Sequence, residues 1–347
     1  MDSSCNGLCT KFLTSRVIED ENRNNSGEDV AMNAEARIRN ICIYGVGGIG
    51  GLYGGKIAYD LHQRGNDQRR VFFIARGPHL AEIRRNGLIL NTPEHRDMIC
   101  TPTMVTDNVG EIPPPDLCLM CVKSYDLDNA IKALAKNINP STMIIPLLNG
   151  VDVYERIRTN LQDGMVLPAC VYVGTHIEKP GIVTQSGGEG IILCGSDPKI
   201  TDFNPEALIR FFSQVDVTFR WNDDPYPEIW KKYIFIASFG LVSAYSGKTL
   251  DEIVSNHRLK ETTREIMMEI VAIAGERGIA LPEDVVNLSI DKARDFPPGT
   301  KTSYQADVEK KAKRNEGDLF GGTIIRLGHR LGVPTPVTKG IYAAIQK

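Results

Sequence analysis

A glycine pattern that suits the binding of a diphosphate group occurs at residues 45–50. The apolar segment 41–44 leads directly into Gly45-Val46-Gly47-Gly48-Ile49-Gly50, which has the spacing G-x-G-x-x-G. After a strand, the first glycine permits a tight turn, the second lets the backbone approach a pyrophosphate, and the third lets the next helix pack closely. The positive end of that helix dipole then faces the phosphates. The pattern predicts a dinucleotide-binding unit; the alternative is a glycine-rich turn without a ligand.

The residue that ends the next apolar segment indicates which nicotinamide cofactor would bind. Residues 71–75 are typical of a buried strand, and Arg76 follows them. NAD-binding sites usually carry an acid at this place, which accepts hydrogen bonds from the ribose 2′-hydroxyl. A guanidinium instead suits a 2′-phosphate. We therefore expect NADP(H) rather than NAD(H), the alternative being a solvated arginine at a strand end.

Lys232 and Glu316 are the candidate catalytic residues for ketone reduction, which requires a proton donor. Lys232 begins the apolar stretch 233–242, where partial desolvation would lower the pKa of its ammonium group toward a range useful for an acid. The Glu316 carboxylate could hold an ammonium group or a substrate hydroxyl. Taken alone, a lysine on a helix is more often solvated, and Glu316 is more often an acid at the start of the helix that follows.

Two further polar residues directly follow predicted strands. Asn149 ends the apolar segment 144–148, and Lys123 follows 117–122. The carboxyl ends of strands in a doubly wound sheet are where side chains reach a bound dinucleotide. Asn149 could therefore lie near the nicotinamide and Lys123 near a phosphate. The alternative for Asn149 is a plain Asn-Gly turn.

Alternating strand and helix patterns must position these residues in the first half of the chain. Expected strands are 40–44, 71–75, 117–122 and 142–147, and expected helices lie near 48–64, 78–86 and 126–137. This alternation predicts a parallel, doubly wound sheet. Later strands at 166–175, 181–185 and 190–194 are expected to extend that sheet with antiparallel pieces.

Long segments with helical periodicity follow residue 221, after the helix-start signal Asp223-Asp224-Pro225. The expected helices are 227–246, 249–256, 259–277, 282–294, 303–314, 318–331 and 336–346. The predicted fold class is thus an α/β, Rossmann-like N-terminal domain (37–220) followed by an all-α domain for substrate binding and dimerisation (221–347). Residues 1–36 are polar and are expected to be a disordered extension, within which Met32 could be a native start.

Composition excludes several classes of function. The chain has 347 residues, and 43 acidic residues against 40 Lys and Arg give a net charge of −3, so no nucleic-acid or membrane-binding patch is expected. No apolar stretch reaches the ~18 residues of a membrane span. Eight scattered cysteines are typical of a reduced, cytoplasmic protein. Cys118 and Cys121 have a metal-like spacing, but on one strand they would face opposite sides, and no metal is expected.

The order of these motifs resembles that of the ketopantoate reductase (2-dehydropantoate 2-reductase) family over nearly all of residues 38–346. Each motif alone is modest, and the combined order and spacing are specific. The matching segments are 45–50, Arg76, 122–124, 148–150, 174–176, 230–232, 302–307, 315–318 and 332–336.

The resemblance implies catalytic and substrate-binding roles. Lys232 matches the catalytic lysine of the family, a general acid that also grips the substrate, and Glu316 matches the glutamate near the substrate. Asn149 matches an asparagine at the nicotinamide and substrate end, and Ser303 matches a serine that contacts the substrate.

The resemblance also implies a cofactor site and an assembly. Arg76 and Lys123 match the basic residues that recognise NADP. The expected cofactor site consists of these two residues, all of residues 45–50 (including Val46 and Ile49), Asn149 and Glu316. A small-molecule 2-oxo acid is the expected partner. A homodimer through the C-terminal helices is also possible, because many members of the family are dimers.

Two departures from the family pattern bear on the substrate. Ile236 and Gly240 stand where the family often has asparagines, and both share a helix face with Lys232, so they are expected to line or flank the substrate pocket. The leading expectation is NADPH-dependent reduction of 2-dehydropantoate to (R)-pantoate in pantothenate synthesis. The alternatives are a reductase of a different 2-oxo acid and a non-catalytic NADP-binding sensor.

Overall fold

A parallel six-stranded sheet carries the glycine loop and the polar residues that follow the predicted strands. The computed structural model describes residues 38–347 except 66–67, 201 and 312–313, so the expected extension 1–36, with Met32, lies outside the described residues. The sheet has the order β5-β2-β1-β6-β7-β8, with every neighbouring pair parallel, as expected for the Rossmann-like part. Its strands are β1 (Asn40–Tyr44), β2 (Arg70–Ile74), β5 (Met104–Thr106), β6 (Leu117–Met120), β7 (Met143–Pro146) and β8 (Met165–Val166).

The sheet grows in both directions from β1. Strands β2 and β5 lie on one side of β1, and β6, β7 and β8 lie on the other. A reversal of strand order opens a crevice at the carboxyl ends of the two strands on either side of it, which is where such sheets bind ligands. The glycine loop follows β1 and Lys123 follows β6, so both lie at this crevice.

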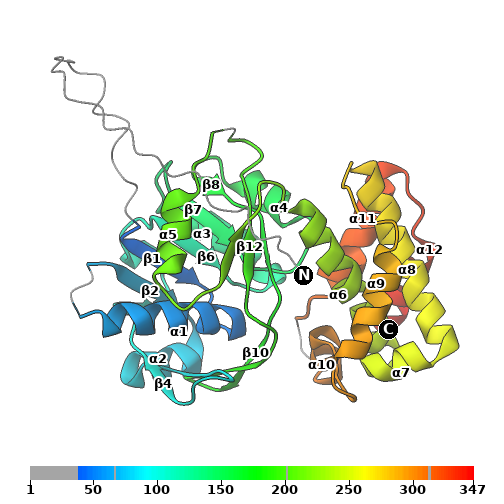
Figure 1. The fold of residues 1–347 in the computed structure, drawn as a ribbon, viewed down its shortest axis with the longest axis horizontal. Helices are drawn as coiled ribbons and strands as arrows, with labels where there is room; N and C mark the ends of the chain where they lie inside the picture. Colours follow the sequence, from blue (N-terminus) through cyan, green and yellow to red (C-terminus); the bar gives the residue numbers. More distant parts are fainter. Residues whose placement is uncertain (1–37, 66–67, 201, 312–313) are drawn as a thin grey trace, which may run out of the picture. The chain divides into compact units, whose positions relative to one another are not determined.

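Helices cover both faces of the sheet (Figure 1), which explains why its strands are almost continuously apolar. Along β1, Ile41 and Ile43 pack into the core that includes α1 (Gly48–Gln63) and α5 (Glu206–Ser213). Cys42 faces the opposite core, which includes α3 (Leu127–Leu134) and α4 (Val153–Asn160). Cys118 and Cys121 likewise pack against opposite cores, as their spacing on a strand predicts.

The expectation that the later strands extend the first sheet is wrong. After β8, Pro168 interrupts the predicted strand 166–175, because proline has no N–H to donate to a ladder. The following strands form two separate sheets with segments that the sequence did not mark as strands. One has the order β10-β11-β3-β4, from Gly174–Lys179, Ile182–Gly187, Leu88–Asn91 and Met98–Cys100; the other has the order β13-β12-β9, from Phe219–Trp221, Ile192–Cys194 and Ala169–Val171.

The C-terminal part is helical, as predicted, with α6 (Tyr226–Ser246) packed against α8, α9, α10 and α12. Helix α6 is apolar on nearly every face because these helices surround it. It ends at Gly247, whose φ of +70° is the left-handed conformation of a helix stop. The other helices are α7 (Leu250–Ser255), α8 (His257–Glu276), α9 (Val285–Lys292), α10 (Ser303–Glu309), α11 (Thr323–Leu331) and α12 (Pro336–Ile345), yellow to red in Figure 1.

A short π-helical turn, Asp318–Gly322, precedes α11 and takes the place of the expected start of a regular helix. The buried hydroxyl of Tyr233 on α6 donates hydrogen bonds to the carbonyl oxygens of Leu319 and Phe320, at 2.7 and 3.1 Å. The residue after Lys232 therefore fixes the segment that directly follows Glu316.

Candidate active site

Lys232 lies in the second turn of α6, between residues that anchor the helix in the core. Trp230 and Tyr233 are each 1% exposed, whereas Lys232 is half-buried. Its Nζ donates a hydrogen bond to Oδ1 of Asn149 at 2.7 Å. Lys232 and Asn149 are 83 positions apart in the sequence, and both were predicted site residues. The structure brings them into direct contact.

Burial shifts the proton affinity of Lys232 as the sequence predicts. Desolvation lowers the pKa of its ammonium group to about 8, and the positive charge of Lys292 acts in the same direction. Cys170 and Glu316 oppose this shift by stabilising the charged form. An ammonium group with a pKa near neutrality is suited to donate a proton at physiological pH.

The turn after β7 holds Asn149 in place. Gly150 has φ of +127°, a conformation that side chains rarely adopt, and a Cβ there would lie 2.7 Å from Cδ1 of Leu319. The Asn-Gly turn therefore packs closely on the segment that follows Glu316. Both the hydrogen bond to Lys232 and this packing fix the amide of Asn149.

Glu316 holds Lys123 rather than Lys232. Nζ of Lys123 lies 2.9 Å from Oε2 of Glu316 and 3.8 Å from Oδ2 of Asp307. Burial works to lower the pKa of Lys123, but the Glu316 carboxylate outweighs it and the pKa of Lys123 is raised. Glu316 is 5% exposed, and its buried charge is matched by the ammonium group of Lys123, whose side chain is 46% exposed. Glu316 influences Lys232 through its electrostatic field.

The glycine loop contains three glycines that packing requires, Gly45, Gly48 and Gly50, and one that it does not. A Cβ at Gly48 would lie 2.9 Å from the carbonyl oxygen of Thr175. Gly45 has φ of +95°, and a Cβ there would lie 2.8 Å from the backbone nitrogen of Val122. A Cβ at Gly50 would collide with the carbonyl oxygen of Gly45. At Gly47, by contrast, a Cβ would meet no described atom within 4 Å. Open space beside Gly47, at the N-terminus of α1, is what a pyrophosphate needs to approach the backbone.

Arg76 follows β2, as predicted, and it is tied to a carboxylate that the sequence did not single out. Its Nη2 lies 2.6 Å from Oδ2 of Asp126, and Nη1 of Arg314 lies 2.7 Å from the other oxygen of the same carboxylate. The guanidinium of Arg314 also covers the ring of Tyr125, with 4.3 Å from Cζ to the ring centroid. Arg76 remains 72% exposed, so its guanidinium is accessible from solvent.

The three other residues that were expected to bind the substrate, Ser303, Ile236 and Gly240, have different environments. Ser303 is exposed at the first position of α10, and Ile236 is half-buried one turn after Lys232. Gly240 is buried, and a Cβ there would contact Phe320 at 3.7 Å and Tyr304 at 3.8 Å. Aromatic side chains therefore cover the position where the family often has an amide.

Sequence reasoning missed Tyr172 and Lys292. Tyr172 follows β9, and Nζ of Lys232 lies 5.8 Å from the centroid of its ring. Nζ of Lys292 lies 4.5 Å from the same centroid. A basic residue in the last turn of a helix is common, because it interacts favourably with the helix dipole, so no local signal distinguishes Lys292.

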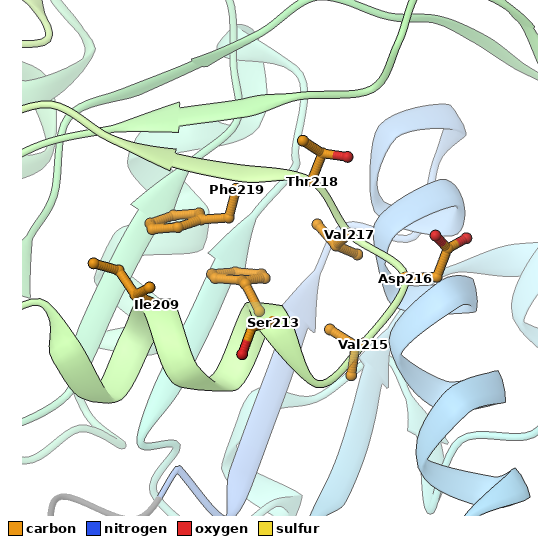
Figure 2. A pocket seen from close by; sticks show the side chains of 8 residues that line it. Ile209, Ser213, Val215, Asp216, Val217, Thr218 and Phe219 are labelled. Atoms are coloured by element: carbon orange, nitrogen blue, oxygen red, sulfur yellow. The ribbon is translucent and has the colours of Figure 1, made fainter. Parts of the chain in front are cut away.

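A separate hollow of about 320 Å³ lies between α5 and β13 (Figure 2). Its lining includes Ile209, Val217 and Phe219, and its charged residue, Asp216, is paired with Lys56 at 2.9 Å. No residue of the candidate site lines this hollow. Among the described residues, no group of three or more His, Cys, Asp or Glu could hold a metal ion, and no helix is long and apolar enough to cross a membrane.

Comparison with known proteins identifies the family of this chain. The family model described as "Ketopantoate reductase PanE/ApbA" matches residues 41–198, and its C-terminal counterpart matches residues 225–347. The chain belongs to the ketopantoate reductase family. As a member, it is an oxidoreductase that acts on a CH–OH group, and the family implies a nicotinamide cofactor. Its homologues act on small keto acids.

Relatives from several bacteria share this family over most of their length. A 2-dehydropantoate 2-reductase of Mesorhizobium japonicum is 26% identical over 330 residues, covering 88% of this chain and 97% of that protein. An uncharacterized oxidoreductase of Bacillus subtilis, YkpB, is 24% identical with the same coverage. The crystal structure of a PanE/ApbA family ketopantoate reductase from Ralstonia eutropha has a TM-score of 0.78 and 27% identity, covering 88% of this chain and 97% of that one.

Proposed function

We propose that this protein reduces 2-dehydropantoate to (R)-pantoate with NADPH, a step of pantothenate synthesis. The observation that carries the proposal is the contact between Nζ of Lys232 and Oδ1 of Asn149, at the end of β7. This hydrogen bond places an ammonium group with a pKa of about 8 at the carboxyl ends of the strands of the Rossmann-like sheet, where such sheets bind dinucleotides. The proposal places the enzyme in the cytoplasm, as a homodimer through its C-terminal helices.

Lys232 supplies the proton in the proposed reaction. Bound NADPH would supply the hydride for the ketone carbon. Lys232 donates a hydrogen bond to the ketone oxygen and then its proton to the developing alkoxide, so that Lys232 becomes a neutral amine that solvent reprotonates. Asn149 holds the ammonium group in place, and Glu316 stabilises its charged form through the electrostatic field.

The residues of the cofactor site fit NADP(H). The N-terminus of α1 carries no acidic residue in its first turn and no side-chain cap, so its N–H groups are available to phosphate oxygens. The exposed guanidinium of Arg76 suits a 2′-phosphate. On binding NADPH, Arg76 would either leave Asp126 for the 2′-phosphate or contact both groups.

The residues one and two turns after Lys232 on α6 favour weak selection for the substrate hydroxyl. Ile236 is apolar, and Gly240 is covered by Phe320 and Tyr304, so neither position offers a hydrogen bond from a side chain. Strong selection for a hydroxyl requires polar groups that are left unpaired when the hydroxyl is missing.

Oxidation of NADPH and of NADH, followed by absorbance with a panel of 2-oxo acids, tests the proposal. We expect faster turnover with NADPH, and a ratio of kcat/KM below ~10³ between 2-dehydropantoate and 2-oxo-3,3-dimethylbutanoate, which lacks the hydroxyl. A larger ratio would show that other residues bind the hydroxyl. Absence of oxidation with every 2-oxo acid would contradict the proposal and favour an NADP-binding sensor.

A further inference from the structure

Two ammonium groups face one aromatic ring beside the Asn149 turn. Nζ of Lys292, at the end of α9, lies 4.5 Å from the ring centroid of Tyr172, and Nζ of Lys232 lies 5.8 Å from it. Lys292 also lies 6.0 Å from the ring centroid of Phe235, the neighbour of Ile236 on α6. The charge of Lys292 lowers the pKa of Lys232, which is consistent with this proximity.

Lys292 has no carboxylate partner within 4.0 Å among the residues that the structure describes. The acids of this region are engaged elsewhere. Glu228 pairs with Lys231, Asp291 pairs with Arg294, and Glu316 pairs with Lys123. Two like charges held near each other disfavour their charged forms, and an anion between or beside them relieves this repulsion.

We infer that Lys292 binds the carboxylate of the 2-oxo acid substrate and so orients its ketone toward Lys232. The inference rests on the proposed function and adds a substrate-binding residue to it. In a 2-oxo acid the carboxylate is bonded directly to the ketone carbon, so a cation near the proton donor suits it. Because positions 236 and 240 offer no side-chain donor, a charged donor from α9 supplies the binding that amides there would give.

The kinetics of the Lys292→Gln variant with a 2-oxo acid and with the neutral ester of that acid test the inference. The substrates are 2-oxo-3,3-dimethylbutanoate and its methyl ester, with NADPH oxidation as the readout. Losing a charge-assisted hydrogen bond should raise KM for the acid by ~10–100-fold while kcat stays within ~3-fold. KM for the ester should stay within ~3-fold, because the ester has no charge to bind. If the wild-type protein reduces the ester too slowly, its inhibition constant against the acid replaces KM.

Two further variants complete the design. Lys292→Arg keeps the charge and should restore most of the affinity for the acid. Lys339→Gln removes the same charge from an exposed position on α12 and should leave both substrates unaffected. Equal losses for acid and ester in Lys292→Gln, or no loss for either, would overturn the inference and leave the proposed function intact. A wild-type protein that reduces no 2-oxo acid would overturn the proposed function, and the inference with it.

Discussion

Lys232 combines an unusual proton affinity with a defined hydrogen-bond partner. Its ammonium group has a pKa of about 8 and donates a hydrogen bond to Oδ1 of Asn149 at 2.7 Å. Both properties come from its place on α6, where Trp230 and Tyr233 are buried and hold the helix against the core. A lysine on a solvated helix face would have neither property.

The pH dependence of turnover should follow the protonation of Lys232. The acid form donates the proton, so kcat/KM for a 2-oxo acid should be constant below pH ~7 and fall about tenfold per pH unit above a pKa near 8. Burial of the ammonium group is the main cause of this lowered pKa, and Cys170, Glu316 and Lys292 act on it to a smaller extent. A profile that stays flat to pH ~9.5 would show that another group is the acid.

Arg76→Ala tests the choice of cofactor. Loss of a charge-assisted contact with the 2′-phosphate should cost ~1.5–3 kcal/mol, so the ratio of NADPH to NADH affinities should fall at least ~10-fold. Fluorescence titration of both cofactors measures this ratio. Arg85→Ala, in the helix Gly77–Asn86 that directly follows Arg76, is the matched control; Arg85 is 75% exposed, and its loss should leave the ratio unchanged. An unchanged ratio in Arg76→Ala would refute the assignment.

Local patterns predicted the elements that carry the site. The apolar segment before Gly45 became β1, the glycines became the turn into α1, and the apolar stretch after Lys232 became the buried part of α6. These elements were predictable because each has a strong periodicity or a required backbone conformation. The helices α4 and α5, of eight residues each, were missed.

Pairings between distant residues could not be predicted in the same way. The residues Lys123 and Glu316 are 193 positions apart, and nothing near either one indicates the other. The same holds for Asp126, which joins Arg76 to Arg314, and for Lys292 beside Tyr172. Such contacts depend on tertiary structure, which short-range patterns of charge do not encode.

Two alanine variants separate the roles of the loop glycines. At Gly50, a Cβ would strike the Gly45 carbonyl oxygen, so Gly50→Ala should lower the free energy of unfolding by ~1–3 kcal/mol. At Gly47, a Cβ meets no described atom within 4 Å, so Gly47→Ala should change stability by less than ~1 kcal/mol and weaken NADPH binding. Urea denaturation and NADPH titration measure these effects. Equal stability loss in both variants would contradict a ligand-binding role for Gly47.

At the scale of the whole molecule, three of the polar contacts between the sheet-containing part and the C-terminal part involve residues of the candidate site or their direct partners. They are Lys232 with Asn149, Lys123 with Glu316, and Arg314 with Asp126. The residues after β6 and β7 supply one side of each contact. Both halves of the chain therefore contribute to the proposed proton donor, the expected cofactor site and the expected substrate residues. Neither half would carry the proposed activity alone.

Turnover of the Lys232→Ala variant with NADPH and 2-dehydropantoate is the most direct test of the proposed function. We expect kcat to fall by ~10²-fold or more, while the dissociation constant of NADPH stays within ~2-fold. Lys231→Ala is the matched control, because Lys231 is the neighbouring lysine on α6 and is paired with Glu228, and it should keep near-wild-type turnover. Near-wild-type turnover of Lys232→Ala would contradict the assignment of Lys232 as the proton donor.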